Sequence, residues 1–71
     1  MPLSTKYTVH AFLPSWGAEQ PVMATRELVQ AQQTAEAYAT LYGHSYITST
    51  DSLKQRHYTR QPDGSLEYTE L

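Results

Sequence analysis

Apolar and polar residues alternate along residues 6–13, and this alternation predicts a first β-strand. Successive side chains of a strand point to opposite faces, so a period of two divides the segment into two sides. One side consists of Tyr7, Val9, Ala11 and Leu13, and the other of Thr8, His10 and Phe12. Pro14 ends the predicted strand, because proline has no N–H group to donate to a neighbouring strand. Residues 15–24 contain Gly17 and Pro21 and show no period, so we predict a loop there.

Residues 25–42 show the three- and four-residue spacing of an amphipathic helix. The apolar stripe of this helix consists of Ala24, Leu28, Ala31, Ala35, Tyr38, Ala39 and Tyr42. Thr25 is the predicted N-cap, because its hydroxyl can accept from the free N–H groups of the first turn. Gly43 suits the left-handed position that follows the last turn. Three alanines of the stripe, Ala31, Ala35 and Ala39, lie within the predicted helix and predict a close approach of the helix to a sheet.

A strand pattern returns after Gly43. We predict strands over residues 44–50 and 53–60, separated by a turn, bulge or bend at residues 50–52. A second interpretation places a short helix after Asp51 or Ser52. The pattern leaves open whether residues 44–60 form one bent strand or two.

Residues 61–64, with the sequence Gln-Pro-Asp-Gly, predict a tight hairpin turn. Proline suits the second position of a type I turn, aspartate the third, and glycine the left-handed position that follows. A returning strand then covers residues 66–70. If Gln61 faces Ser65, the register places Tyr58 opposite Tyr68, Arg56 opposite Glu70 and Thr59 opposite Glu67.

Together these elements predict an α+β fold, with a single helix packed on one face of a three- or four-stranded, mainly antiparallel sheet in the order β-α-β-(β)-β. Seventy-one residues leave room for one domain, so residues 1–71 are expected to form a single small domain. Val, Ile, Leu and Phe together number only 12. Six tyrosines and one tryptophan can supply the buried area that these aliphatic residues do not.

Charge and composition exclude several classes of function. A formal net charge of −2 argues against a general binder of nucleic acids or anionic membranes, which needs a broad positive field. No apolar run approaches the roughly 18 residues that a membrane span requires. The absence of cysteine excludes disulfides and thiolate metal sites. Residues 1–6 lack the pattern of a signal peptide, so we expect a cytoplasmic protein without a membrane partner.

The predicted C-terminal hairpin combines cations with aromatic rings. Lys54, Arg56, Tyr58 and Arg60 alternate onto one face, and Tyr68 joins them across the turn. Single-stranded nucleic acids bind to surfaces of this kind, with cations for the phosphates and ring faces for the bases. Glu70 lies opposite Arg56, however, and neutralises part of the positive charge. The second interpretation is therefore a face with cross-strand ion pairs, or a tyrosine pair under the helix whose edge the arginine stems cover.

No catalytic or metal-binding signature stands out. His10, His44 and His57 lack the spacing of metal ligands, and we expect separate, partly exposed imidazoles, no metal site and no cofactor. There is no nucleophile motif, and the three glycines are too dispersed to cradle a phosphate. A core this small can hardly wall an enclosed cleft. We therefore expect a protein that is not an enzyme.

One helix covers one face of a sheet, so the other face is expected to be bare. His10, Phe12 and whichever of Tyr46 or Ile47 points outward are predicted to lie there, and exposed aromatic residues mark a partner surface. Trp16 in its loop is either a recognition anchor or a lid that folds over the open end of the core, and we favour the lid.

These patterns predict a small non-enzymatic interaction or regulatory module that docks on a partner protein, or on a second copy as a homodimer, through its bare sheet face or its hairpin. The residues predicted to bind the partner are Phe12, Trp16, Arg56, Tyr58, Arg60 and Tyr68. The alternative is a nucleic-acid-binding module that uses the hairpin 53–70 through Lys54, Arg56, Tyr58, Arg60 and Tyr68.

Overall fold

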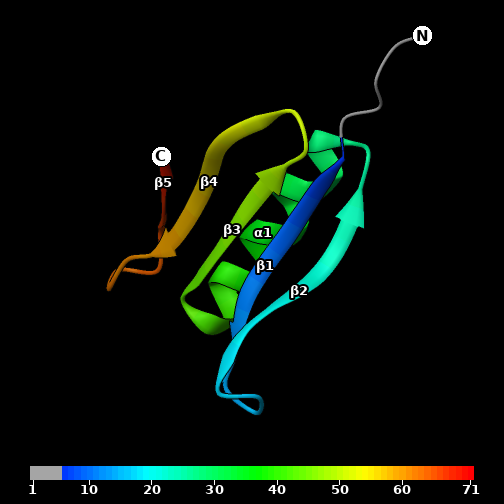
Figure 1. Cartoon of the computed structure of the whole chain (residues 1–71). Coiled ribbons are helices and arrows are strands. Elements are labelled where there is room, and N and C mark those ends of the chain that lie inside the picture. Colours follow the sequence, from blue (N-terminus) through cyan, green and yellow to red (C-terminus); the bar gives the residue numbers. More distant parts are fainter. Residues whose placement is uncertain (1–5) are drawn as a thin grey trace, which may run out of the picture.

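The computed structural model describes residues 6–71, in which one helix packs on an antiparallel sheet of five strands (Figure 1). The elements in chain order are β1 (Tyr7–Leu13), β2 (Ala18–Thr25), α1 (Leu28–Tyr42), β3 (His44–Ser49), β4 (Ser52–Arg60) and β5 (Leu66–Glu70). The order in the sheet is β2-β1-β3-β4-β5. The predicted α+β class is confirmed. Residues 1–5 lie outside the described part. They make up most of residues 1–6, the segment in which we expected no signal peptide.

The predicted strand count is wrong, because residues 18–25 form a strand where we expected a loop. The turn before β2 is closed by N–H groups of Trp16 and Gly17, which donate to the carbonyl oxygen of Leu13 at 2.9 and 3.1 Å. Gly17 has a φ of 67°, a conformation open to glycine at little cost. β2 is an outer strand of the sheet, and an outer strand tolerates Pro21 because only one of its sides needs partners.

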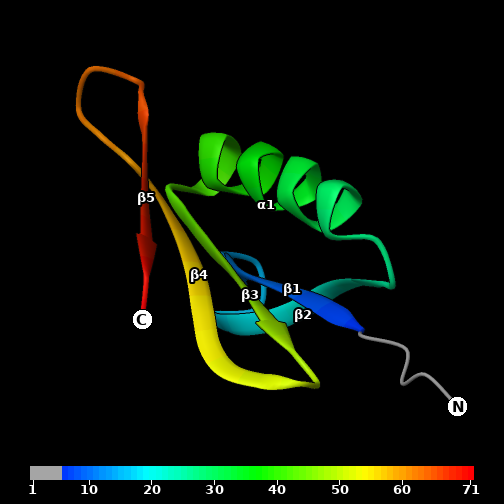
Figure 2. The same cartoon turned by 90° about the horizontal axis from the view of Figure 1, so that it is seen from above.

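The core lies between α1 and the central strands. β2 and β3 both run antiparallel to β1, so α1 connects two parallel strands and crosses β1 on the way. Figure 2 shows α1 on one side of these three strands only. The buried residues of the core are Val9, Ala11, Ala31, Ala35, Ala39, Ile47 and Tyr58. The three helix alanines are completely buried, which confirms the predicted close approach of the helix to the sheet.

The helix begins later than predicted and ends as predicted. Thr25 is the last residue of β2, and its hydroxyl accepts from the N–H of Glu27 at 3.2 Å before the helix begins at Leu28. Glu27 is the N-cap and makes no side-chain capping bond. Gly43 is left-handed, with a φ of 97°, and its N–H donates to the carbonyl oxygen of Ala39 at 2.7 Å.

The C-terminal half follows the predicted pattern closely. Residues 44–60 form two strands with a turn at residues 50 and 51, so the short helix considered for this place is wrong. The 61–64 turn forms as predicted, because the N–H of Gly64 donates to the carbonyl oxygen of Gln61 at 2.9 Å. The predicted register is confirmed, with the pairs Tyr58–Tyr68, Arg56–Glu70 and Thr59–Glu67.

The β4–β5 hairpin leaves the plane of the other strands. Figure 2 shows β4 bending so that β5 stands beside one end of α1. Arg60, at the end of β4, links the hairpin to this end of α1. Its Nη1 donates to the carbonyl oxygen of Thr40 at 2.6 Å, and its backbone N–H donates to the carbonyl oxygen of Gly43 at 2.9 Å.

Candidate functional site

The sheet face opposite α1, here called the open face, carries a series of aligned rings. Val9, Ile47 and Tyr58 point into the core, so their strand neighbours His10, Tyr46 and His57 point to the open face. These three residues are register partners on β1, β3 and β4.

The rings on the open face are stacked on one another. His10 and Tyr46 have ring centroids 4.7 Å apart, and Tyr46 and His57 have centroids 4.9 Å apart, with interplanar angles of 10° and 15°. His44 lies beside His57, with centroids 5.1 Å apart. We call these four residues, His10, His44, Tyr46 and His57, the ring cluster. The predicted outward orientation of His10 is confirmed. Of the two candidates on β3, Tyr46 points outward and Ile47 lies in the core.

Hydrogen bonds to neighbouring side chains hold each ring in place. His10 Nε2 lies 3.1 Å from Oγ1 of Thr48, and the hydroxyl of Tyr46 donates to Glu19 at 3.2 Å. On β4, His57 Nε2 lies 2.9 Å from Oε1 of Gln55, while its Nδ1 lies 3.0 Å from Nε2 of His44. The ring cluster is therefore an ordered, half-buried surface.

Burial is the main cause of the pKa shifts of His10, Tyr46 and His57. It lowers the pKa of His10, and the charge of Glu19 opposes this in part. Burial also lowers the pKa of His57, with a further contribution from the charge of His44 and an opposing one from Glu19. The pKa of Tyr46 is raised, by burial first and then by Glu19. Near neutral pH, His10, Tyr46 and His57 are thus uncharged and lie beside one carboxylate.

Phe12 and Trp16 lie at the end of the open face formed by the β1–β2 turn. Phe12 is 42% exposed and pairs with Glu19 on β2. Trp16 is 71% exposed, and Figure 1 shows the turn that carries it projecting beyond α1. The interpretation of Trp16 as a lid over the core is therefore wrong, because most of this residue is exposed.

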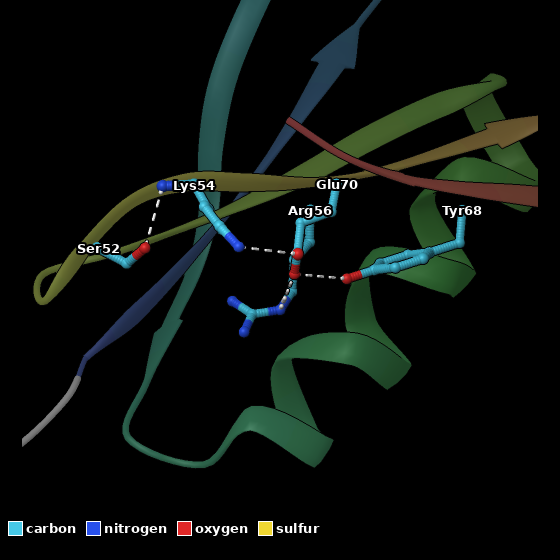
Figure 3. A network of polar contacts seen from close by, with 5 residues as sticks. All are labelled: Ser52, Lys54, Arg56, Tyr68 and Glu70. Atoms are coloured by element: carbon cyan, nitrogen blue, oxygen red, sulfur yellow. Dashed lines mark hydrogen bonds and ion pairs between the residues drawn. The ribbon is translucent and has the colours of Figure 1, made fainter.

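The cations of the hairpin are engaged within the molecule. Figure 3 shows Lys54 and Arg56 converging on Glu70, with Lys54 Nζ 3.6 Å from Oε1 and Arg56 Nε 4.0 Å from Oε2. The hydroxyl of Tyr68 donates to the same Oε2 at 3.3 Å. The guanidinium carbon of Arg56 also lies 5.8 Å from the ring centroid of Tyr7.

Tyr58 belongs to the core rather than to a free surface. Only 6% of it is exposed, and its ring lies 5.2 Å from that of Tyr68. These contacts, together with the bond of Arg60 to Thr40, match the second interpretation of the hairpin. In that interpretation, ion pairs cross the hairpin and a tyrosine pair lies beside the helix. The residues predicted to bind a partner are not brought together on one surface. Phe12 and Trp16 lie at the β1–β2 end of the molecule, and Arg56 and Tyr58 lie on the side of α1.

The expectation of separate imidazoles is wrong, because His10, His44 and His57 share the open face. The alternation that placed Lys54, Arg56 and Tyr58 on one side of β4 also places His57 on the other, and this signal could have been read from the sequence. Within residues 6–71, no group of three or more His, Cys, Asp or Glu side chains is arranged to hold a metal ion.

Two further observations limit the kinds of site in this molecule. The structure contains no pocket of a size that would enclose a small substrate, as far as residues 6–71 define it. Within the same residues, no helix has the length and apolar character needed to cross a membrane.

The sequence matches no protein family, and neither a curated protein nor a solved structure shows significant similarity to it.

Proposed function

We propose that this protein is a small, non-enzymatic interaction module that docks on a partner protein through the open face and the adjacent β1–β2 turn. The ring cluster is the main support for this proposal. It consists of aligned, half-buried rings on a face that no helix within residues 6–71 covers. Surfaces with ordered aromatic side chains are costly to leave in water and are typical of binding sites.

The chemistry at the end of the open face indicates what the partner presents. Phe12 and Glu19 are register partners, both are exposed, and the hydroxyl of Tyr46 donates to Glu19. Trp16 follows in the adjoining turn. We call Phe12, Trp16, Glu19 and Tyr46 the docking patch. An exposed ring beside an exposed carboxylate matches an arginine side chain, whose guanidinium pairs with the carboxylate and stacks on a ring.

Charge also favours a different protein over a second copy of this chain. A two-fold contact centred on the docking patch is made by the same residues of both copies. It therefore brings two Glu19 carboxylates into one interface, where like charges repel. Homodimer formation is accordingly one of the outcomes that the experiment below distinguishes.

The hairpin provides less support for nucleic-acid binding. Lys54 and Arg56 already pair with Glu70, and Arg60 donates to Thr40. A strand of nucleic acid would have to displace these contacts before the cations could neutralise its phosphates. On the open face, Glu19 repels phosphate. We therefore propose a protein partner.

Quantitative binding with matched variants tests this proposal. The tagged protein is used to capture partners from its native host, and each captured protein is purified and titrated with wild type and variants. We expect Phe12→Ala, Trp16→Ala and Glu19→Gln each to weaken binding at least about tenfold, the size of a hot-spot effect. The controls are Leu41→Ala and Glu36→Gln on the exposed side of α1, which should bind as wild type does.

Three results would contradict the proposal. One is equal binding by the docking-patch variants and the controls. Another is a homodimer in sedimentation whose affinity rises in Glu19→Gln, which would identify the second copy as the occupant. The third is salt-dependent binding of single- or double-stranded oligonucleotides that Arg56→Glu and Arg60→Glu abolish, which would identify the hairpin as a nucleic-acid site.

A further inference from the structure

The imidazole rings of His44 and His57 share one hydrogen bond. Nε2 of His44 and Nδ1 of His57 lie 3.0 Å apart, and the two rings are within 27° of parallel. At the other side of the His57 ring, Nε2 lies 2.9 Å from Oε1 of Gln55. A carbonyl oxygen only accepts, so neutral His57 carries its proton on Nε2 and accepts at Nδ1. The proton between the two rings therefore belongs to His44.

This arrangement makes the two histidines unequal as bases. A first proton adds to Nδ1 of His44, whose Nε2–H continues to donate to His57. That hydrogen bond then becomes stronger, because its donor is charged. A second proton must add to Nδ1 of His57, the atom that already accepts. Two N–H groups would then face each other, with positive charge on both rings, so the pair has to separate.

We propose that His44 and His57 form a proton-operated switch on the open face. The pair is closed, with its two rings hydrogen-bonded, when it binds one proton or none. The pair opens, and the two rings separate, when it binds the second proton. His57 stacks on Tyr46 with centroids 4.9 Å apart. A separation that displaces His57 therefore also breaks its stacking contact with Tyr46.

The other titratable groups around the pair come from the neighbouring strands. β2 contributes Glu19, and the ring cluster itself contributes His10 and Tyr46. On β5, Glu67 pairs with Thr59, which in turn pairs with His44. The two carboxylates favour charged imidazoles, whereas His10 opposes a further positive charge when it is itself protonated. Their balance sets the pH at which the second proton binds.

The consequence for docking rests on the function proposed above. When the pair is closed, it carries at most one positive charge, and a docked arginine lies beside Glu19. With two imidazolium groups on the same face, the arginine meets more positive charge. Partner affinity should therefore fall as the pH decreases from 7 to 5.

NMR titration of the imidazole signals of the full chain tests the switch without a partner. We expect two protonation steps, in which His57 takes up the second proton and the ring signals of Tyr46 shift in that second step. His44→Ala removes both the donor and the neighbouring charge, so the titration of His57 should move to higher pH, by on the order of one unit. His10→Ala is the matched control, because it removes an imidazole of the same face and leaves the hydrogen bond of the pair intact. It should shift the titration of His57 less than His44→Ala does.

The outcomes separate the switch from the docking function. The switch would be overturned if His57 titrated identically in wild type and in His44→Ala. It would also be overturned if the ring signals of Tyr46 did not shift in the second protonation step. A coupled titration supports the switch whatever the partner does. If partner affinity is then the same at pH 7 and pH 5, the switch stands and the docking site proposed above is wrong.

Discussion

The hydroxyl of Ser45 donates to the carbonyl oxygen of Ala35 at 2.5 Å, and both residues are completely buried. This contact joins β3 to the middle of α1, where the completely buried side chains of the helix are alanines. A buried hydroxyl without a partner is costly, so the position of Ser45 fixes how the helix lies across the strands.

The first prediction concerns this hydrogen bond. Ser45→Ala should lower the free energy of unfolding by about 1 kcal/mol, the usual net value of a buried hydrogen bond. In a domain of this size, that loss corresponds to a melting temperature lower by about 4–8 °C. Urea unfolding measures the change, with Ser15→Ala in the exposed β1–β2 turn as control. Equal stability of the two variants would show that the hydroxyl contributes nothing.

The second prediction concerns the close packing of α1. Ala35 is completely buried, whereas Ala37 on the same helix is exposed. Ala35→Leu should destabilise the protein by about 1–3 kcal/mol or more, because the larger side chain forces the helix away from the sheet. Ala37→Leu should change stability by no more than about 0.5 kcal/mol. Thermal unfolding of the two variants checks this difference, and equal melting temperatures would contradict it.

The third prediction concerns Gly43 at the end of α1. Its φ of 97° is in the left-handed region, and an added Cβ atom would meet no atom within 4 Å. Any cost of Gly43→Ala therefore comes from the backbone conformation alone, and we expect about 1–2 kcal/mol. Gly43→Asn should cost less, because asparagine adopts this conformation more readily. Chemical unfolding ranks the three proteins, and an alanine variant as stable as the asparagine variant would disagree with this explanation.

The fourth prediction concerns acid. Burial lowers the pKa values of His10 and His57 in the folded protein, whereas in the unfolded chain both titrate near 6.5. As the pH falls below about 6.5, the unfolded state binds more protons than the folded state, so stability decreases. The decrease is complete once the pH is below the lowered pKa values.

Urea unfolding at several pH values between 7.5 and 5 measures this loss. His10→Gln removes one of the two groups and should show a smaller decrease over the same range. The groups that face His10 are Tyr46 on β3 and Glu19 on β2, and only Glu19 opposes the shift. A variant with the same acid sensitivity as wild type would assign the effect to other groups.

The C-terminal hairpin could be predicted in detail because its signals are local. Residues 61–64 specify a turn, and once Gln61 faces Ser65 every pair along β4 and β5 follows. The end of α1 at Gly43 was equally readable, because a left-handed residue after the last turn is a property of a few neighbouring residues. At these positions, neighbouring residues alone are enough to predict the structure, and contacts with distant parts of the chain are not required.

β2 could not be predicted because its formation depends on β1. Gly17 and Pro21 are typical of loops, and the segment has no alternation of its own. Its place at the outside of the sheet makes the proline acceptable, and the register shifts between Val9 and His10 where Pro21 pairs. Only the pairing with a complete neighbouring strand reveals this element.

The ring cluster was predicted in part. The alternation in β1 is enough to predict that His10 points outward. The partner of Tyr46 on β4, by contrast, depends on the register between β3 and β4. That register contains an irregularity between Ile47 and Ser49, which no local pattern specifies. The hydrogen bond between His44 and His57 follows from the same register and was therefore missed.

Pro21 also affects how strands of other molecules can approach the sheet. An incoming strand at the β2 margin would meet a position without an N–H donor and a neighbour whose register is shifted. At the opposite margin, β5 has five residues and carries Glu67 and Glu70. Both margins are poor templates for the continuous ladder that builds cross-β fibrils. We therefore expect that the folded protein does not readily add strands of other molecules at either margin.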